Sequence, residues 1–284
     1  MAAVVFALLA ATTNALSSVL QRLAARTAPP SDGCWLSQVR YLLRQPVWYG
    51  GMAGLILGFL LQASALDRAP LALVQPLLVT ELPLTLLFAR PLLHMPMEPR
   101  SWVAAVLLAA GLALLLVAAS PSGGQHQPSS AAWVLATAVT GGILAVLVTL
   151  ARHASGPLRS ALLGACAGIG FGLTAAFMKA ATEHLGGGLP ALLDTWQVYA
   201  MVFSGIASVA LLQAAFHAGP IIAAQPPVTL LDPIASTGYG IALFSDQVRG
   251  GWWIALELTG LVLIAAGTAE MSRSPLLADA SWQR

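Results

Sequence analysis

Two acidic side chains, Glu81 and Asp232, lie in stretches of the sequence that are otherwise apolar and rich in proline. The stretches are PLALVQPLLVTELPLT, residues 70–85, and PIIAAQPPVTLLDPIA, residues 220–235. An ionised carboxylate in the middle of a bilayer costs roughly 2.5 to 3.5 kcal/mol on insertion scales. A chain keeps such a group where it meets water, a partner or a ligand. The two acids therefore indicate cation coordination or proton coupling, and the alternative is a structural carboxylate satisfied by hydroxyls or backbone donors.

The two stretches repeat one pattern. The aligned pairs are Pro70 with Pro220, Gln75 with Gln225, Pro76 with Pro226 and Pro83 with Pro233, and Glu81 is matched by Asp232 one position out of step. Helix-breaking residues and acids in corresponding places of two halves are the best pointer in a sequence to a transporter's binding site. The pattern predicts a central site that includes Glu81 and Asp232, with Gln75 and Gln225 as further contacts.

Oxygen-bearing side chains follow Gln225 at the spacing of one helix face. Thr229, Asp232 and Ser236 fall at i+4, i+7 and i+11 from Gln225, and Thr85 falls at i+4 from Glu81. Such faces supply oxygen ligands, which suit hard cations, so Glu81 and Asp232 are the candidate metal ligands. Interhelical hydrogen bonding, at about 0.6 kcal/mol per bond, explains the same pattern equally well.

A second polar stripe lies near the N-terminus. It consists of Asn14, Ser17, Ser18 and Gln21, at i, i+3, i+4 and i+7. Lipid cannot satisfy these groups, so the stripe is expected to face the interior of a helix bundle. There it either lines the path of a solute, with Asn14 as a candidate contact, or joins helices through its serines.

Glycines recur at every fourth position in two places, Gly50, Gly54 and Gly58 and then Gly164, Gly168 and Gly172. Such small-residue faces predict close helix crossings. The run GIGFG at residues 168–172 is not read as a nucleotide loop, because it lies in an apolar stretch with no preceding strand. The sequence has no serine–histidine–aspartate, cysteine–histidine or paired-carboxylate arrangement of a hydrolase. Neither an enzymatic activity nor a cofactor is therefore predicted.

The elements that must position these residues are membrane helices. The 284-residue chain is 58% hydrophobic and 8% charged, whereas soluble domains carry about 25% charged residues. The composition predicts an all-α polytopic membrane protein, with a short interfacial helix or a plain linker at residues 27–46. About nine spans are expected, at residues 3–25, 47–66, 71–89, 101–119, 131–151, 160–182, 196–216, 220–245 and 251–271. Tryptophans, including Trp133, fall at span ends, as expected at membrane interfaces.

The internal repeat extends beyond the two acidic stretches. LLQA at residues 60–63 matches LLQA at 211–214, and ALSS with Arg22 resembles GLTA with Lys179. Spans one to four thus pair with six to nine, and the fifth span turns the second unit over. A 4+1+4 arrangement of inverted repeats is therefore predicted. Its parts are a first repeat at 1–119, a flexible external linker, fifth helix and loop at 120–159, a second repeat at 160–271, and a tail at 272–284.

Positive charge predicts the orientation. Ten of the thirteen lysines and arginines fall on one side of the predicted spans, and three, Arg68, Lys179 and Arg249, fall on the other. The protein is therefore predicted in the plasma (inner) membrane, with its N-terminus outside and its C-terminus in the cytoplasm. Lys179 is expected to snorkel to the interface, and Glu257 is expected to pair with Lys179 or Arg249.

The run LLQASALDRAPLALVQPLLVTELPLTLLFA, followed by the glycine-bearing AAVLLAAGLALLL, resembles the drug/metabolite transporter superfamily. The resemblance covers roughly residues 1–271 and is closest to the EamA-like and NIPA-like branches, the latter being nine-span magnesium transporters. It implies a secondary transporter that moves a small solute, with Mg²⁺ as one candidate, by alternating access. A proton-coupled exporter of a small organic metabolite or drug, and a non-transporting membrane scaffold, are the alternatives. The expected partners are the solute or cation, the lipid bilayer and a second copy of the chain, with no sign of nucleic acid.

Overall fold

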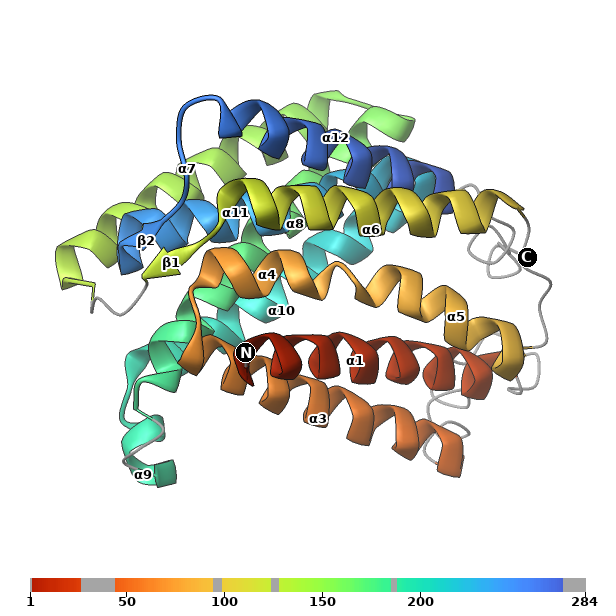
Figure 1. Ribbon diagram of the computed structural model, residues 1–284, viewed down its shortest axis with the longest axis horizontal. Helices are drawn as coiled ribbons and strands as arrows, with labels where there is room; N and C mark the ends of the chain where they lie inside the picture. The colour runs from red at the N-terminus through yellow and green to blue at the C-terminus, as the bar shows by residue number, and fades with distance from the viewer. Residues whose placement is uncertain (1, 27–43, 94–98, 124–127, 185–187, 273–284) are drawn as a thin grey trace.

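The computed structural model describes residues 2–26, 44–93, 99–123, 128–184 and 188–272, which are almost entirely helical (Figure 1). The helices are α1 (Ala2–Arg26), α3 (Pro46–Arg68), α4 (Leu71–Leu78), α5 (Glu81–Leu93), α6 (Pro99–Ala119), α7 (Ser130–His153), α8 (Gly156–Thr182), α9 (Gly188–Leu193), α10 (Trp196–Ala218), α11 (Ile221–Phe244) and α12 (Trp253–Ser272). The structure also contains two short strands, β1 (Ser122–Gly123) between α6 and α7 and β2 (Asp246–Gln247) between α11 and α12. The interfacial element expected at 27–46 and the tail beyond α12 lie largely outside the described residues.

Eight helical segments in the described residues are long and apolar enough to cross a bilayer, with α4 and α5 counted as one. They expose many valine, leucine, isoleucine and phenylalanine side chains, as surfaces in contact with lipid do. Helix α11 has a similar length, and its apolar run is interrupted by Gln225, Asp232 and three prolines. The protein is therefore an all-α polytopic membrane protein, as its composition predicts.

The third predicted span is broken in the structure. It divides into α4 and α5 at Val79 and Thr80. Pro83 has no N–H to donate to the Val79 carbonyl. This carbonyl instead accepts a hydrogen bond from the Leu82 N–H at 3.1 Å, in a tight turn between the two helices. The break makes Glu81 the first residue of α5, and the unpaired N–H groups of a helix N-terminus favour a carboxylate there.

Helices of the two halves pack in corresponding pairs. Helix α1 packs against α3 and α5, and α8 packs against α10 and α11. Aligned residues make equivalent contacts in the two halves. Gly54 of α3 faces Ser17 of α1, and Gly205 of α10 faces Thr174 of α8. The packing therefore follows the pairing of spans that the sequence repeat predicts.

The counterpart helices α1 and α8 run in opposite directions. Lys179, near the C-terminal end of α8, donates a hydrogen bond to the Ala69 carbonyl just after α3. Arg68, in the same turn, lies over the ring of Phe6 near the start of α1. The end of α8 therefore lies where α1 begins, which is the relation that an inverted repeat requires.

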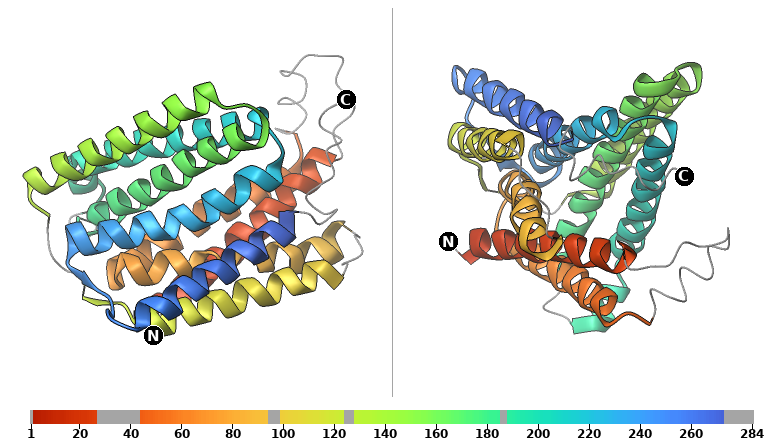
Figure 2. Two further views of the ribbon diagram at one scale, coloured as in Figure 1. Left: turned by 90° about the horizontal axis from the view of Figure 1, so that it is seen from above. Right: turned by 90° about the vertical axis from the view of Figure 1, so that its right-hand side faces the viewer.

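Helices α6 and α12 lie side by side and join the two halves (Figure 1). A Cβ at Gly111 would lie 2.7 Å from the Gly260 carbonyl oxygen, and a Cβ at Gly260 would lie 2.8 Å from the Gly111 carbonyl oxygen. A reciprocal contact of this kind is what a two-fold relation produces. Helix α7, which has no counterpart in the repeat, lies at the edge of the bundle and packs mainly against α8 (Figure 2).

The segment after α6 pairs with the second half. Strand β1 runs antiparallel to β2, with Gly123 opposite Asp246. The Arg249 N–H also donates to the Ala119 carbonyl at 2.9 Å. The start of the predicted linker, Ser122–Gly123, is therefore paired with the second half. One end of the bundle is where β1 pairs with β2 and where α3, α6, α8 and α11 finish. We call this end the strand end.

Aromatic packing explains one tryptophan differently from the sequence prediction. Trp133 is buried, and its ring stacks on Phe177 with centroids 4.8 Å apart. Trp196 and Phe244 meet the same ring edge-on. Trp133 therefore belongs to the core of the strand end, whereas Trp252 is exposed as a membrane-interface residue is expected to be.

Candidate functional site

Glu81 lies at the start of α5 and interacts with α1. Its half-buried carboxylate is hydrogen-bonded by the side chains of Asn14 and Ser18. One turn later, Thr85 donates its hydroxyl to the Glu81 carbonyl at 2.7 Å. The Thr85 oxygen can still accept a hydrogen bond or bind a cation through its lone pairs. The polar stripe on the first span therefore meets this acid, with Asn14 and Ser18 as donors.

Asp232 lies in the middle of α11, one residue before Pro233. Ser236 donates its hydroxyl to Asp232 Oδ1 at 3.3 Å. Pro233 has no N–H for the Thr229 carbonyl, which therefore lacks its usual helical partner. The glycine face of α8 packs on the same stretch of backbone, since a Cβ at Gly168 would lie 3.2 Å from the Asp232 nitrogen. The close crossing that the glycines predict is confirmed, and it places the Asp232 backbone directly against α8.

The remaining polar residues of α11 bond along their own helix. Ser236 and Thr229 are buried, Gln225 is half-buried, and the Thr229 hydroxyl donates to the Gln225 carbonyl at 3.1 Å. Gln75 on α4 is different. It is buried, and its Nε2 has no acceptor among the described residues. Because an unsatisfied buried amide costs about 1–3 kcal/mol, Gln75 is a stronger candidate for a solute contact than Gln225.

The structure gives the two acids separate neighbours. Glu81 interacts with α1, whereas Asp232 interacts with Ser236 of its own helix and packs on α8. It is α4, rather than α5, that packs extensively on α11. Among the described residues, no three acidic, histidine or cysteine side chains gather into a metal site. The structure therefore brings Asn14 to Glu81 and Ser236 to Asp232, and it records no interaction that joins the two carboxylates in the described part of the chain.

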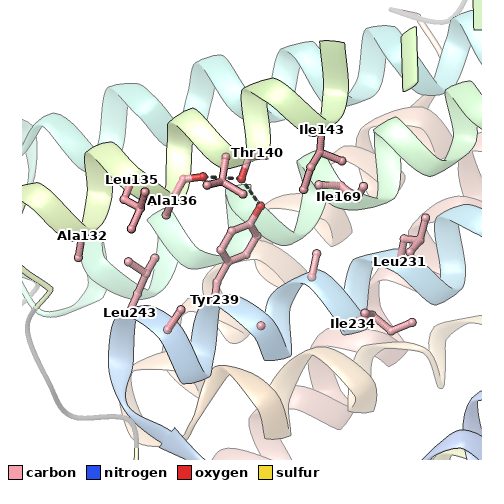
Figure 3. A pocket seen from close by; sticks show the side chains of 14 residues that line it. Ala132, Leu135, Ala136, Thr140, Ile143, Ile169, Leu231, Ile234, Tyr239 and Leu243 are labelled. Atoms are coloured by element: carbon pink, nitrogen blue, oxygen red, sulfur yellow. Dashed lines mark hydrogen bonds between the residues drawn. The ribbon is translucent and has the colours of Figure 1, made fainter. Parts of the chain in front are cut away.

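An apolar pocket of about 480 Å³ lies between α7, α8 and α11 (Figure 3). Tyr239 points across it, and its hydroxyl forms a 2.6 Å hydrogen bond with Thr140 Oγ1. Leu231 and Ala235, close to Asp232 in sequence, form part of the α11 wall. Its size and its mainly apolar lining, with one polar pair, suit a small organic molecule.

A buried lysine at the strand end was missed by the sequence analysis. Lys179 does not snorkel, because only 4% of it is exposed. Its ammonium donates hydrogen bonds to the carbonyls of Ala69 at 2.8 Å and Leu66 at 3.4 Å, and lies 5.4 Å from the centroid of the Phe244 ring. The last carbonyls of a helix carry partial negative charge. Lys179 of the second half therefore caps the end of α3 in the first half.

Asp246 makes the complementary contact. Ser245 caps the C-terminus of α11: its backbone is left-handed (φ 59°), and its N–H donates to the Gly240 carbonyl. This turn places Asp246 so that its Oδ2 accepts a hydrogen bond from the Ala72 N–H at 3.1 Å, at the N-terminus of α4. Burial raises the pKa of Asp246 above its usual range, while the Ala72 N–H and the charge of Lys179 oppose that rise. Lys179 and Asp246, which both belong to the second half, therefore both interact with the α3–α4 turn.

The predicted partner of Lys179 was wrong. Glu257 was expected to pair with Lys179 or Arg249, but Lys179 interacts with the α3–α4 turn and Arg249 lies over the Trp253 ring. Glu257 Oε1 is buried without a hydrogen bond to the described residues. One signal was present in the sequence, because Lys179 is the chain's single lysine and lies within an apolar stretch. Asp246 gave no such signal, since it follows a predicted span and reads as an ordinary loop acid.

Comparison with known proteins adds one relative. The chain is 29% identical over 277 residues to an uncharacterised protein of Corynebacterium glutamicum, covering 96% of this chain and 95% of the relative. No family model and no solved structure matches the chain. The similarity therefore covers nearly the whole of both chains, and the relative assigns no activity to the site.

Proposed function

We propose that the protein is a secondary transporter of the drug/metabolite type, which moves a small solute through a central site by alternating access. One observation supports this most strongly: half-buried carboxylates, Glu81 and Asp232, occupy corresponding positions in the two halves. The paired packing of α1 with α5 and of α8 with α11 agrees with two related units. A purely structural scaffold has no need for an acid in the middle of each unit.

The first candidate solute is a small cation such as Mg²⁺. Mg²⁺ keeps several water ligands and binds proteins through one or two carboxylates. Glu81 with Asn14, and Asp232 with Ser236, each offer a carboxylate with polar neighbours for such a partly hydrated ion. In this proposal the ion contacts the acids in turn or together as the two halves move.

The test is Mg²⁺ flux into proteoliposomes for the wild-type protein, Glu81→Gln and Asp232→Asn. Each amide keeps the shape but loses the charge, so we expect flux to fall about tenfold or more. Flux by the wild type is expected to fall as the pH drops, because a proton competes with the cation for each carboxylate. Asp67→Asn, which changes an exposed acid at the end of α3, is the matched control and is expected to leave flux unchanged. Wild-type flux and pH profile in both amides would contradict the central acidic site.

A proton-coupled exporter of a small organic solute is the second candidate, and the apolar pocket beside α11 favours it. Ala136→Phe would fill this pocket from α7. If the solute is organic, the substitution is expected to reduce proton flux driven by that solute. If the solute is a cation at the acids, Mg²⁺ flux is expected to be unaffected by Ala136→Phe. A protein that moves neither class of solute would be better described as a membrane scaffold.

The same proposal places the strand end outside the cell, in the plasma (inner) membrane. The lower number of positive charges at that end supports this orientation. A cysteine at Gln125 is expected to react with an impermeant reagent added to intact cells, and one at Ser274 is not. The opposite labelling pattern would reverse the orientation. A homodimer stays part of the proposal, to be tested by the mass of the purified protein in nanodiscs.

A further inference from the structure

Two contacts of opposite charge join the halves at one turn. Lys179 donates to the last carbonyls of α3, and Asp246 accepts from the Ala72 N–H at the start of α4. A cation at a helix C-terminus and an anion at a helix N-terminus both interact favourably with the helix dipole. Both side chains belong to the second half and both targets to the first. These contacts can therefore exist only while the two halves are closed at the strand end.

Neighbouring packing closes the same end. Strand β1, which follows the first half, pairs with β2 of the second half. Helix α4 packs on α11 and α8, whereas α5, beyond the break, packs mainly on α1 and α6 of its own half. Apart from the α6–α12 pair, contacts between the halves are thus concentrated at the strand end. The break at Val79 separates α4, which packs on α11 and α8 of the other half, from α5, which packs mainly on its own half.

We infer that Lys179 and Asp246 form a charged latch that holds the strand end shut and opens when the central site is exposed to that side of the membrane. The inference rests on the proposed transport function, since a transporter that exposes its central site to each side of the membrane in turn must break this contact in each cycle. Its targets are backbone N–H and C=O groups, which water can satisfy once the halves separate. The latch can therefore open without leaving a buried polar group unpaired.

The latch is tested by the reactivity of a cysteine at Ala72, which is 3% exposed beneath it. The protein is purified in nanodiscs, with Cys34 and Cys166 replaced by alanine, and reacted with a water-soluble maleimide. Lys179→Gln and Asp246→Asn each remove one charged partner from a hydrogen bond. We expect each to increase the rate of labelling at position 72 by about tenfold. Labelling reads the latch whether or not a solute is moved, so failure of the transport proposal leaves this test intact.

Matched controls come from the same turn. Arg68→Gln and Asp67→Asn make the same changes of charge in an exposed ion pair of this turn. Arg68 lies over Phe6 of its own half, and Asp67 acts on Lys179 through its charge alone, which water screens because the side chain is exposed. They are expected to leave labelling at position 72 unchanged. A variant that keeps Cys166 as its one cysteine reports general loosening, because Cys166 is completely buried in α8. Its labelling is expected to stay slow in Lys179→Gln and Asp246→Asn.

Equal labelling at position 72 in the latch variants and the controls would overturn the inference. So would a parallel increase at Cys166, because it would show that the substitutions loosen the whole fold. If Lys179→Gln gives no folded protein, Asp246→Asn decides alone, since its amide oxygen can still accept from Ala72 while its charge is lost. Lys179→Arg keeps the charge and its donors, and it is expected to label at nearly the wild-type rate.

Discussion

The broken span α4–α5 and the continuous helix α11 are counterparts in the sequence, and they differ in the structure. Both carry a glutamine, several prolines and a central acid. In α4–α5 the chain breaks at Val79 and Thr80, so that Glu81 begins a helix. In α11 three prolines are accommodated in one helix, and Asp232 stays in its interior. Related sequences thus adopt two conformations in one molecule, an asymmetry that is compatible with the proposed alternating access.

Helix α8, which packs on α11, also differs from helix α1, which packs on α4–α5, in the size of the residues at the contact. Helix α8 presents Gly168 to α11, and a Cβ there would lie 2.8 Å from the Val228 carbonyl oxygen. In the alignment that pairs Ser17 with Thr174, the position of Gly168 is occupied on α1 by Ala11, which is completely buried. A glycine permits the closest approach of two helices, and an alanine keeps them farther apart. The second half therefore holds its acidic span more closely than the first half does.

The largest effect is expected where the approach is closest. Gly168→Leu would force a side chain into the α11 backbone next to Asp232, with no flexible neighbour to yield. Most of the folded protein is expected to be lost, as measured by the monodisperse peak after extraction in detergent. Leu173→Ala, at a half-buried position of the same helix, is expected to keep most of its folded yield. Equal yields for the two variants would mean that the glycine face does not carry the contact with α11.

The prolines of the two spans provide the next comparison. Pro233 lies inside continuous α11, so Pro233→Ala restores a hydrogen bond to the Thr229 carbonyl and is expected to stabilise the protein by about 1–3 kcal/mol. Pro83 is the third residue of α5, where the N–H has no helical partner in any case, so Pro83→Ala is expected to change stability little. Thermal unfolding in detergent measures both. An equal rise in Tm would imply that the break at Val79 closes readily.

Much of the fold could be predicted from the sequence, because lipid imposes strong constraints on it. Long apolar runs gave the helices, and the two matching proline stretches gave the pairing of the spans. The interaction of Asn14 with Glu81 follows from a polar stripe that lipid cannot satisfy. These features depend on local composition or on repeated patterns, which a single sequence displays.

Other features depended on tertiary contacts that a single sequence does not display. Pro76 and Pro83 permit a break, but similar prolines leave α11 continuous, so packing against α8 and α1 decides the outcome. Lys179 was assigned to the interface because it lies near a helix end. Its burial depends on backbone carbonyls more than 100 positions away, and carbonyls have no signature in a sequence. For the same reason Asp246 was overlooked.

The glutamines of the two spans give a smaller and more specific test. Gln75 has a buried Nε2 with no acceptor in the described residues, whereas Gln225 is half-buried. Gln75→Met removes the unsatisfied amide and keeps the size, so it is expected to stabilise the protein by about 1 kcal/mol while it reduces solute flux. Gln225→Met is expected to change stability less. Increased stability with unchanged flux in Gln75→Met would assign Gln75 no contact with the solute.

The smallest effect concerns Arg22, which is the counterpart of Lys179 in the repeat. Arg22 lies near the C-terminal end of α1, away from the strand end. In an inverted repeat, the contact that Lys179 makes with the α3–α4 turn is expected to be matched, in the other state, by a contact of Arg22 with the α10–α11 turn. In the present state that turn is held by its own half, because the Ser160 hydroxyl donates to the Ala215 carbonyl at 2.8 Å. Arg22→Gln should therefore destabilise the state in which the strand end is open.

The measurement is labelling of a cysteine at position 72 in the Lys179→Gln background, where opening is frequent enough for a decrease to be detected. Adding Arg22→Gln is expected to slow labelling by about threefold, a modest factor because Arg22 is only half-buried and water screens its charge. Arg152→Gln, an exposed arginine at the same end, is the control and is expected to have no effect. Faster labelling after Arg22→Gln would show that Arg22 and Lys179 stabilise the same state. The two halves would then not exchange the conformations of α4–α5 and α11.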